Sequence, residues 1–196
     1  MKVKISKGNM KLGKIPNSSL IPVKDCINSK WCKNVCYAKK AWRLYPSARK
    51  AWTINSKIIH SDMEQWKNDH IEWVQKHEPK LFRFFQAGDV ISKEHFDKIK
   101  EICEACPNTK FIMFTKAFKF IDYPIPLNLC VVLSLFPKMK VPDRLAYLPR
   151  AYYYENSDDY ADKRFLKALE CHGGCDHCGM CWHLNKLNKD VKFLKH

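Results

Sequence analysis

Glycine is scarce in this chain, with 6 residues among 196, and this excludes collagen-like and glycine-rich low-complexity structures. Long apolar runs are also missing. None approaches the roughly 18 residues that a membrane-spanning helix needs, so we expect no membrane partner. The first residues, Met1-Lys2-Val3-Lys4, lack the apolar core of a signal peptide. The sequence therefore favours a cytoplasmic protein.

The length and the hydrophobic content predict one folded domain. Hydrophobic residues make up 46% of the chain, which is typical of a globular protein. The chain is shorter than the roughly 250 residues of a complete eight-stranded (β/α) barrel. We therefore divide a single domain into a basic leading segment (1–25), a barrel core (26–170) and a cysteine-rich segment with a basic tail (171–196).

Apolar runs and helical patterns alternate in the middle of the chain. Strands are predicted over 81–86, 111–115 and 128–134, with a helix over 92–106 that Ser92 caps. Such alternation indicates an α/β protein with mostly parallel strands, here a partial (β/α) barrel with a C-terminal cysteine-rich loop. Further elements are expected outside this unit: a strand near 20–23, helices within 47–77, short strands within 145–154, a helix over 159–170 and a helical tail over 182–196.

Ten cysteines are present, and in a cytoplasmic chain they indicate metal or redox chemistry more than disulfides. Four lie close together near the C-terminus: Cys171, Cys175, Cys178 and Cys181. The last three repeat the C-x2-C-x2-C spacing that binds iron–sulfur clusters, with Cys171 as a candidate fourth ligand. Four thiolates also suit a zinc site, and free thiols are a third interpretation.

A second group consists of Cys26, Cys32 and Cys36. Three thiolates in one loop can hold three irons of a [4Fe–4S] cluster and leave the fourth iron open. A buried pair plus one incidental cysteine is the alternative. The two groups could serve one cluster or two. Cys130 is interpreted as a small buried apolar residue. Cys103 and Cys106 form a C-x2-C pair near a helix end, where we expect one of them to face the core, with metal binding as the alternative.

The charge balance is strongly basic, with 35 Lys and Arg against 20 Asp and Glu and a net charge of +15. Such a charge is typical of proteins that bind polyanions. Aromatic residues such as Trp42, Tyr45 and Trp52 lie among the basic ones, which suits the stacking of bases. The sequence thus indicates a nucleic-acid partner, with a solvated basic surface as the alternative.

Several motifs, in their order, resemble the phage "gene product 88" family. They are Cys26…Cys32…Cys36-Tyr37-Ala38, Tyr45-Pro46-Ser47-Ala48-Arg49, Asn55, the strand end Phe82 to Val90 with Gly88-Asp89, the strand end Phe111 to Lys116, the run from Pro126-Leu127-Asn128 to Ser134, and the final Cys-x2-Cys-x2-Cys-Trp. The resemblance covers about residues 9–183. It is consistent with a location in the phage or host cytosol.

The same order is similar to radical SAM-like iron–sulfur proteins. This similarity implies a [4Fe–4S] cluster at the C-terminal mouth of a partial barrel, where an open iron binds S-adenosylmethionine and an electron cleaves it to a deoxyadenosyl radical. It also implies that Asp89, Lys116 and Ser134, each at a strand end, line one cofactor pocket beside the N-terminal cysteines. The substrate would be a nucleic acid or a protein, and an electron donor would be a partner.

Two other functions fit the same residues. One is an iron–sulfur protein for electron transfer or sensing without radical chemistry. The other is a zinc-stabilised nucleic-acid-binding protein. The sequence does not identify the substrate or the oligomeric state.

Overall fold

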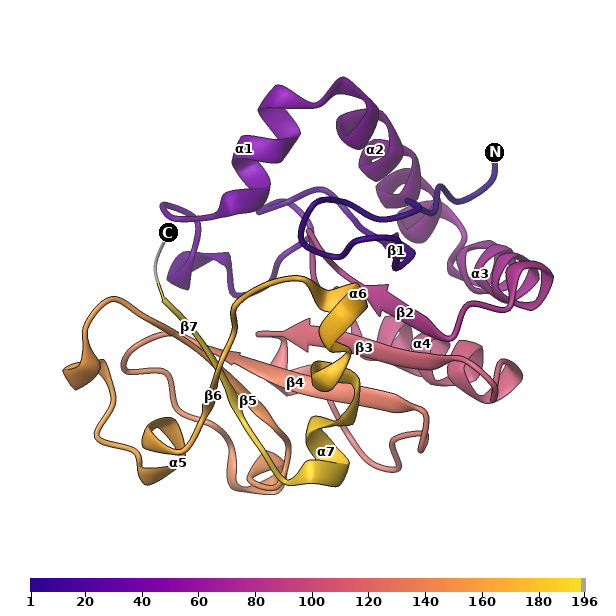
Figure 1. The fold of residues 1–196 in the computed structure, drawn as a ribbon. Coiled ribbons are helices and arrows are strands. Elements are labelled where there is room, and N and C mark those ends of the chain that lie inside the picture. The colour runs from indigo at the N-terminus through magenta and orange to yellow at the C-terminus, as the bar shows by residue number, and fades with distance from the viewer. Residues whose placement is uncertain (195–196) are drawn as a thin grey trace.

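The computed structural model describes residues 1–194, apart from the side chain of Ser157. In this range the strands form a seven-stranded sheet in the order β1-β2-β3-β4-β5-β7-β6 (Figure 1), and all neighbouring strands are parallel. The strands are β1 (Asn17–Ser18), β2 (Leu81–Phe84), β3 (Lys110–Thr115), β4 (Leu129–Leu135), β5 (Arg150–Tyr154), β6 (Leu169–Glu170) and β7 (Val191–Leu194). The predicted α/β class with a partial barrel of parallel strands is confirmed. Because the strands are parallel, their carboxyl ends share one side of the sheet, called here the C-terminal edge.

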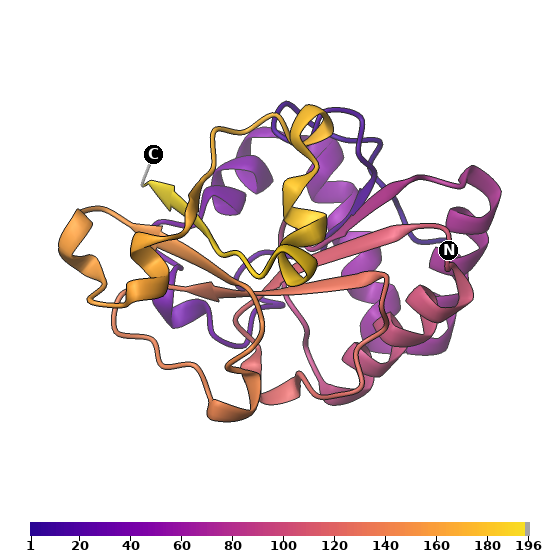
Figure 2. The same cartoon turned by 60° about the horizontal axis from the view of Figure 1, so that its bottom comes forward.

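Helices cover both faces of this sheet. The α-helices are α1 (Tyr37–Leu44), α2 (Pro46–Ser61), α3 (Met63–His77), α4 (Lys93–Ala105), α5 (Lys163–Leu166), α6 (Cys175–Cys178) and α7 (Leu184–Leu187). The 3-10 helices are η1 (Ser29–Trp31), η2 (Phe118–Phe120), η3 (Asp143–Leu145), η4 (Ser157–Asp159) and η5 (Met180–His183). Helices α3 and α4 lie behind the sheet in Figure 1, and α6 and α7 lie in front of it. Figure 2 shows α6 and α7 standing on one side of the strands.

Alternate residues of each strand build two apolar clusters, one on each face. Phe111 and Met113 of β3 point into the large cluster with Trp66 of α3. Ile112, between them, points into the smaller cluster with Trp182 of η5. This alternation follows from the two-residue repeat of a strand. The C-terminal segment therefore packs directly on the sheet face opposite α3 and α4.

Most predicted elements of the central unit are present, including α4, where Ser92 Oγ accepts a hydrogen bond from His95 N at 3.0 Å as expected of the cap. The predicted helix over 159–170 is wrong. Only Lys163–Leu166 is helical, because Asp162 caps the chain three residues later than the expected start, and Leu169–Glu170 pairs with β7 as a strand.

The ends of the chain also differ from expectation. The predicted strand near 20–23 is wrong, because the chain turns there and the first strand is Asn17–Ser18. In the tail, α7 is one short helix and Val191–Leu194 is a strand between β5 and β6. The final residues 195–196 of the predicted helical tail lie outside the described range. The sheet thus uses strands from outside the expected core of 26–170. No helix of the described chain is long and apolar enough to cross a membrane.

Two cysteine groups as candidate metal centres

The N-terminal cysteine group lies on the loop that follows β1, called here the cysteine loop (residues 26–36). Asp25, which is 2% exposed, fixes the start of this loop. Its Oδ2 accepts a hydrogen bond from Ile21 N at 2.9 Å, and its carbonyl oxygen accepts one from Asp89 N at 2.8 Å. Its Oδ1 lies 2.9 Å from His60 Nε2 of α2. No sequence motif marks Asp25, since its partners are distant in the chain.

Two further contacts hold the cysteine loop against the C-terminal edge. Asn28 donates from its side-chain amide to the carbonyl oxygen of Lys116, directly after β3. The Tyr37 hydroxyl donates to the carbonyl oxygen of Gln86, just after β2. The loop is therefore tied to the ends of two neighbouring strands, as a site at the mouth of a parallel sheet requires.

Asp89 and Lys116, two of the three residues predicted to line one pocket, lie at the same edge. The Asp89 carboxylate is 2% exposed and accepts hydrogen bonds from Thr115 Oγ1 at 2.6 Å, Lys116 N at 2.8 Å and Val90 N at 2.8 Å. Burial raises the pKa of Asp89, although the charge of Lys116 and these hydrogen bonds oppose the rise. Asp89 thus connects the segment after β2 to the end of β3.

The charges around the cysteine loop show which groups are neighbours. Burial raises the pKa of Cys26 to about 12, and the nearby charge of Asp89 adds to the rise. Burial also raises the pKa of Cys32, while the charge of Lys116 opposes it. Burial lowers the pKa of Lys116, but Asp89, Cys32 and Cys26 together raise it above the ordinary value. Lys116 is the cation of this thiol group, and Cys36 lies next to Cys32.

Ser134 is the third residue that was predicted to line the pocket with Asp89 and Lys116. It lies within β4, paired in register with Ala151 of β5, and is half-buried. The contacts of Asp89 and Lys116 described above do not include it. Two residues later, Phe136 lies under the Lys116 ammonium, whose nitrogen is 5.8 Å from the ring centroid.

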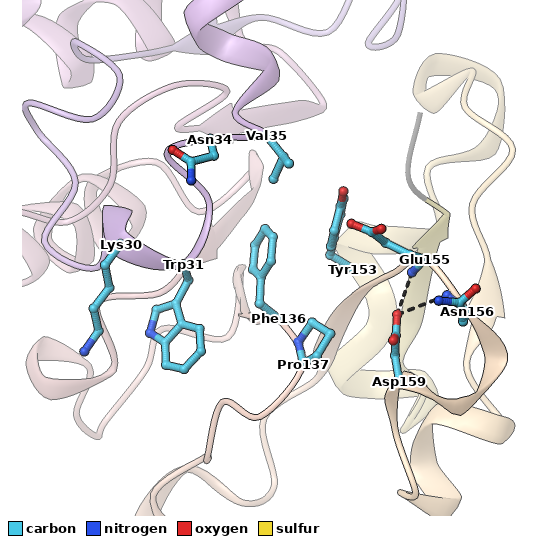
Figure 3. Close-up of a pocket in the computed structure, with 10 residues that line it drawn as sticks. All are labelled: Lys30, Trp31, Asn34, Val35, Phe136, Pro137, Tyr153, Glu155, Asn156 and Asp159. Atoms are coloured by element: carbon cyan, nitrogen blue, oxygen red, sulfur yellow. Dashed lines mark hydrogen bonds between the residues drawn. The ribbon is translucent and has the colours of Figure 1, made fainter.

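A cavity of about 310 Å³ opens between the cysteine loop and the ends of β4 and β5 (Figure 3). The loop contributes residues on one side, and segments after the two strands contribute the other. The lining consists of Lys30, Trp31, Asn34, Val35, Phe136, Pro137, Tyr153, Glu155, Asn156 and Asp159. The rings of Phe136 and Tyr153 stack, with centroids 4.6 Å apart and planes 25° apart.

The C-terminal cysteine group lies on the sheet face. Cys171 follows β6, Cys175 and Cys178 lie in α6, and Cys181 lies in η5. The segment is anchored to the sheet by Trp182, whose Nε1 donates to the carbonyl oxygen of Phe82 at 3.0 Å. Cys175 N also donates to the carbonyl oxygen of Lys11 at 3.0 Å.

These C-terminal thiols are electrostatic neighbours of one another. Burial raises the pKa of Cys181 to about 12, and the adjacent Cys171, Cys175 and Cys178 act on it as well. Burial also raises the pKa of Cys175, while the charge of Arg83 opposes the rise. The cations at this group are Arg83 of β2 and Lys11, whereas Lys116 is the cation at the cysteine loop. The two groups are therefore separate places in the fold.

Buried donors without partners lie on this same sheet face. Among the described residues, Arg83 Nε and Asn17 Nδ2 are buried and have no hydrogen-bond partner. The two residues pair in register on β1 and β2, so they share a face. Unpaired buried donors are costly in a native protein and often mark an acceptor that binds there. Neither residue is recognisable from the sequence, because a lone arginine or asparagine in a strand carries no motif.

The C-terminal thiols are of the ligand type that iron–sulfur clusters and zinc ions bind. Among the described residues, no three His, Cys, Asp or Glu side chains gather closely enough to hold one metal ion. A [4Fe–4S] cluster distributes four thiolates over four irons, so its ligands stand farther apart. Hydrogen bonds to the sulfurs are a usual feature of such centres, and Arg83 and Asn17 have donors to give. The C-terminal group thus offers four thiols, with buried donors on the same sheet face.

Comparison with protein families identifies the chain's relatives. The model of the family described as Gene product 88 matches residues 2–184. The chain belongs to the gene product 88 family. The resemblance drawn from the cysteine spacings and the strand ends is confirmed to this extent, and the match includes both cysteine groups of this gene product 88 protein. Neither the curated proteins nor the solved structures contain a match.

Proposed function

We propose that this protein is an iron–sulfur protein with a [4Fe–4S] cluster in each cysteine group. Cys171, Cys175, Cys178 and Cys181 would hold one cluster completely. Cys26, Cys32 and Cys36 would hold the other and leave one iron open. The observation that carries the proposal is the separation of the thiols into these two groups, each with a cation beside it, Arg83 in one case and Lys116 in the other.

Protonation of the thiols supports metal binding over thiol catalysis. Burial raises the pKa of Cys26 and of Cys181 to about 12 each. A free thiol with so high a pKa is a poor nucleophile at neutral pH. A bound metal, in contrast, deprotonates a coordinating thiol outright. Half-buried thiols of this kind suit cluster ligands.

We further propose S-adenosylmethionine as the ligand of the open iron, as in radical SAM-like proteins. A reduced cluster supplies an electron to the bound sulfonium. The role of the chain is to orient that ligand: the Lys116 ammonium would hold its carboxylate, and Asp89 would keep Lys116 in place through its charge and its hydrogen bond to Lys116 N. Because Asp89 already accepts three hydrogen bonds, we assign it a positioning role.

Metal and sulfide analysis of anaerobically purified protein tests the clusters. We expect brown protein with about eight iron and eight sulfide per chain. Cys32→Ser and Cys178→Ser should each lose about half of the iron. Cys106→Ala, which removes a thiol outside both groups, should keep all of it. Zinc in place of iron would overturn the proposal and favour the zinc-stabilised alternative.

A second assay tests the chemistry at the open iron. Reduced protein is incubated with S-adenosylmethionine, and 5′-deoxyadenosine is measured. We expect turnover that Lys116→Gln weakens through a higher KM for S-adenosylmethionine. Full iron loading without any deoxyadenosine would exclude the radical reaction and leave an electron-transfer or sensing protein.

A further inference from the structure

Two adjoining segments, 1–24 and 26–61, carry positive charge without any acidic residue. Residues 26–61 contain no Asp or Glu. Their eight basic residues are Lys30, Lys33, Lys39, Lys40, Arg43, Arg49, Lys50 and Lys57. This segment forms the cysteine loop, α1 and α2. The segment 26–61 therefore has a charge of +8 and includes the three N-terminal cysteines.

These cations differ from those on the helices behind the sheet. All three lysines of α4 pair with carboxylates, as Lys93 does with Asp97 at 2.6 Å and Lys98 with Glu64 at 2.8 Å. Within the described part of the chain, no Lys or Arg of 26–61 has a carboxylate within ion-pair distance. The positive charge of this segment can therefore attract an anion from outside the protein.

A groove of about 600 Å³ gathers four of these cations. Its lining consists of Pro22, Val23, Lys39, Lys40, Trp42, Arg43 and Arg49, with no acidic residue. Trp42 forms part of the floor and stacks on Trp52, with centroids 6.1 Å apart and planes 23° apart. Cations around an aromatic floor suit a phosphate backbone with bases nearby.

The cysteine-loop residues that line the cavity of Figure 3 precede Cys36 in the chain, whereas α1 follows it. Trp31 from the cysteine loop and the stacked pair of Phe136 and Tyr153 from the strand ends line it. The ammonium of Lys30 lies 5.6 Å from the centroid of a Trp31 ring. A volume of about 310 Å³ lies at the small end of ligand sites, and it suits one ring system such as a nucleobase.

We propose that the groove and the cavity together bind single-stranded nucleic acid, with phosphates along α1 and one unstacked base beside Trp31. In the chain, Cys32 and Cys36 lie between Trp31 of the cavity and the groove residues of α1. The inference rests on the proposed function in this one respect, because it names single-stranded nucleic acid as the substrate class of that centre. A duplex is disfavoured, since a paired base cannot enter a cavity without leaving its stack.

Binding of labelled oligonucleotides by fluorescence anisotropy tests this proposal, without reductant or S-adenosylmethionine. Single-stranded DNA, single-stranded RNA and duplex DNA of one sequence are compared. At least one single strand should bind more than tenfold tighter than the duplex. Trp31→Leu should weaken that binding roughly tenfold, the size expected for one lost base stack. Tyr147→Leu, which changes a 79% exposed tyrosine elsewhere, should leave it unchanged.

The groove has its own test in the salt dependence of binding. Replacing Arg43 and Arg49 with Gln should reduce the slope of log K against log salt by about 0.7 for each lost phosphate contact. Lys167→Gln, an exposed lysine after α5, is the matched control. Thermal melts of all variants confirm folding.

Three results would overturn the inference: no binding of either single strand, equal binding of the duplex, or unchanged binding by folded Trp31→Leu. Iron content and deoxyadenosine are measured separately on the same preparations. The proposed iron–sulfur function can therefore fail while nucleic-acid binding is retained, and the reverse result is equally visible.

Discussion

Thr115 donates its hydroxyl hydrogen to the carboxylate of Asp89 at 2.6 Å, and this bond joins the segment after β2 to the end of β3. The same carboxylate accepts from Lys116 N and Val90 N. Three donors therefore converge on one buried group. The cysteine loop is fixed to this junction, because Asp89 N in turn donates to the carbonyl oxygen of Asp25.

The junction predicts the effect of Asp89→Asn. An asparagine keeps the shape, but its amide nitrogen must face at least one of the three donors, so one buried donor loses its acceptor. We expect a loss of roughly 1–3 kcal/mol in the free energy of unfolding, measured by urea denaturation of metal-free protein. Asp143→Asn, which alters an exposed carboxylate, is the control and should change it little. An unchanged stability for Asp89→Asn would contradict the junction.

Sequence reasoning found the elements that local pattern determines. The strand over 111–115 and the helix over 92–106 are continuous apolar or periodic runs, and a Ser cap and a proline mark the ends of that helix. Their existence depends little on distant residues. The same holds for the cysteine groups, whose spacing is local.

Elements that depend on distant partners were missed. Leu169–Glu170 and Val191–Leu194 become strands because they pair with each other, and the latter also pairs with β5. Asn188 ends α7 with a left-handed φ of 49°, which directs the tail back to the sheet. Pairing across such long separations cannot be recognised in a short window of sequence, so the local pattern predicts helices over 159–170 and 182–196.

Two buried histidines predict loss of stability in acid. Burial lowers the pKa of His70 to about 4 and that of His95 to about 3, against an ordinary value of 6.5. In the unfolded chain both take up protons below 6.5, while the folded protein resists until near pH 4 and pH 3. The histidines therefore do not lower the free energy of unfolding above pH 6.5, but they lower it increasingly as the pH falls toward 4.

The expected size is about 1.4 kcal/mol per pH unit for each histidine in this window. The free energy of unfolding of wild type and His70→Leu is measured by urea denaturation at several pH values between 7 and 4. The free energy of unfolding of His70→Leu should fall less steeply with decreasing pH than that of wild type, by about 1.4 kcal/mol per pH unit. His77→Gln, which changes an exposed histidine, should follow the wild type. Equal slopes for His70→Leu and wild type would refute the assignment.

Asp190 predicts the stability of the C-terminal strand. Its Oδ1 and Oδ2 accept hydrogen bonds from Arg164 Nη2 at 2.7 Å and Nε at 2.8 Å, and Oδ1 also accepts from Arg150 N at 2.8 Å. The carboxylate is buried, and it immediately precedes β7. Asp190→Asn breaks a two-point ion pair and should cost roughly 3 kcal/mol in unfolding free energy.

Hydrogen exchange distinguishes the location of this effect. Amides of Val191–Leu194 and of β5 should lose protection first in Asp190→Asn, since the ion pair connects the start of β7 to α5. If stability falls but β7 keeps its protection relative to the rest of the sheet, the carboxylate acts elsewhere and this interpretation is wrong.

Cys178 provides the sharpest separation of metal binding from packing. Its side chain is exposed in α6, so a methyl group in its place removes no buried surface. In metal-free protein, Cys178→Ala should therefore have a Tm within about 2 °C of wild type, because surface substitutions rarely exceed about 0.5 kcal/mol. In iron-loaded protein the same variant should lose iron and melt well below wild type, because the free energy of metal binding adds to that of folding.

Wild type and Cys178→Ala, each measured metal-free and iron-loaded, give four melting curves. The pattern of the four Tm values decides the role of Cys178. A cluster ligand lowers the Tm only in the loaded protein, and chelation of iron from wild type should reproduce that decrease. A packing residue would lower the Tm equally in both states. A residue with neither role would change none of the curves. Equal iron content and equal Tm for loaded Cys178→Ala and wild type would remove Cys178 from the ligand set and would leave the C-terminal group with three thiols.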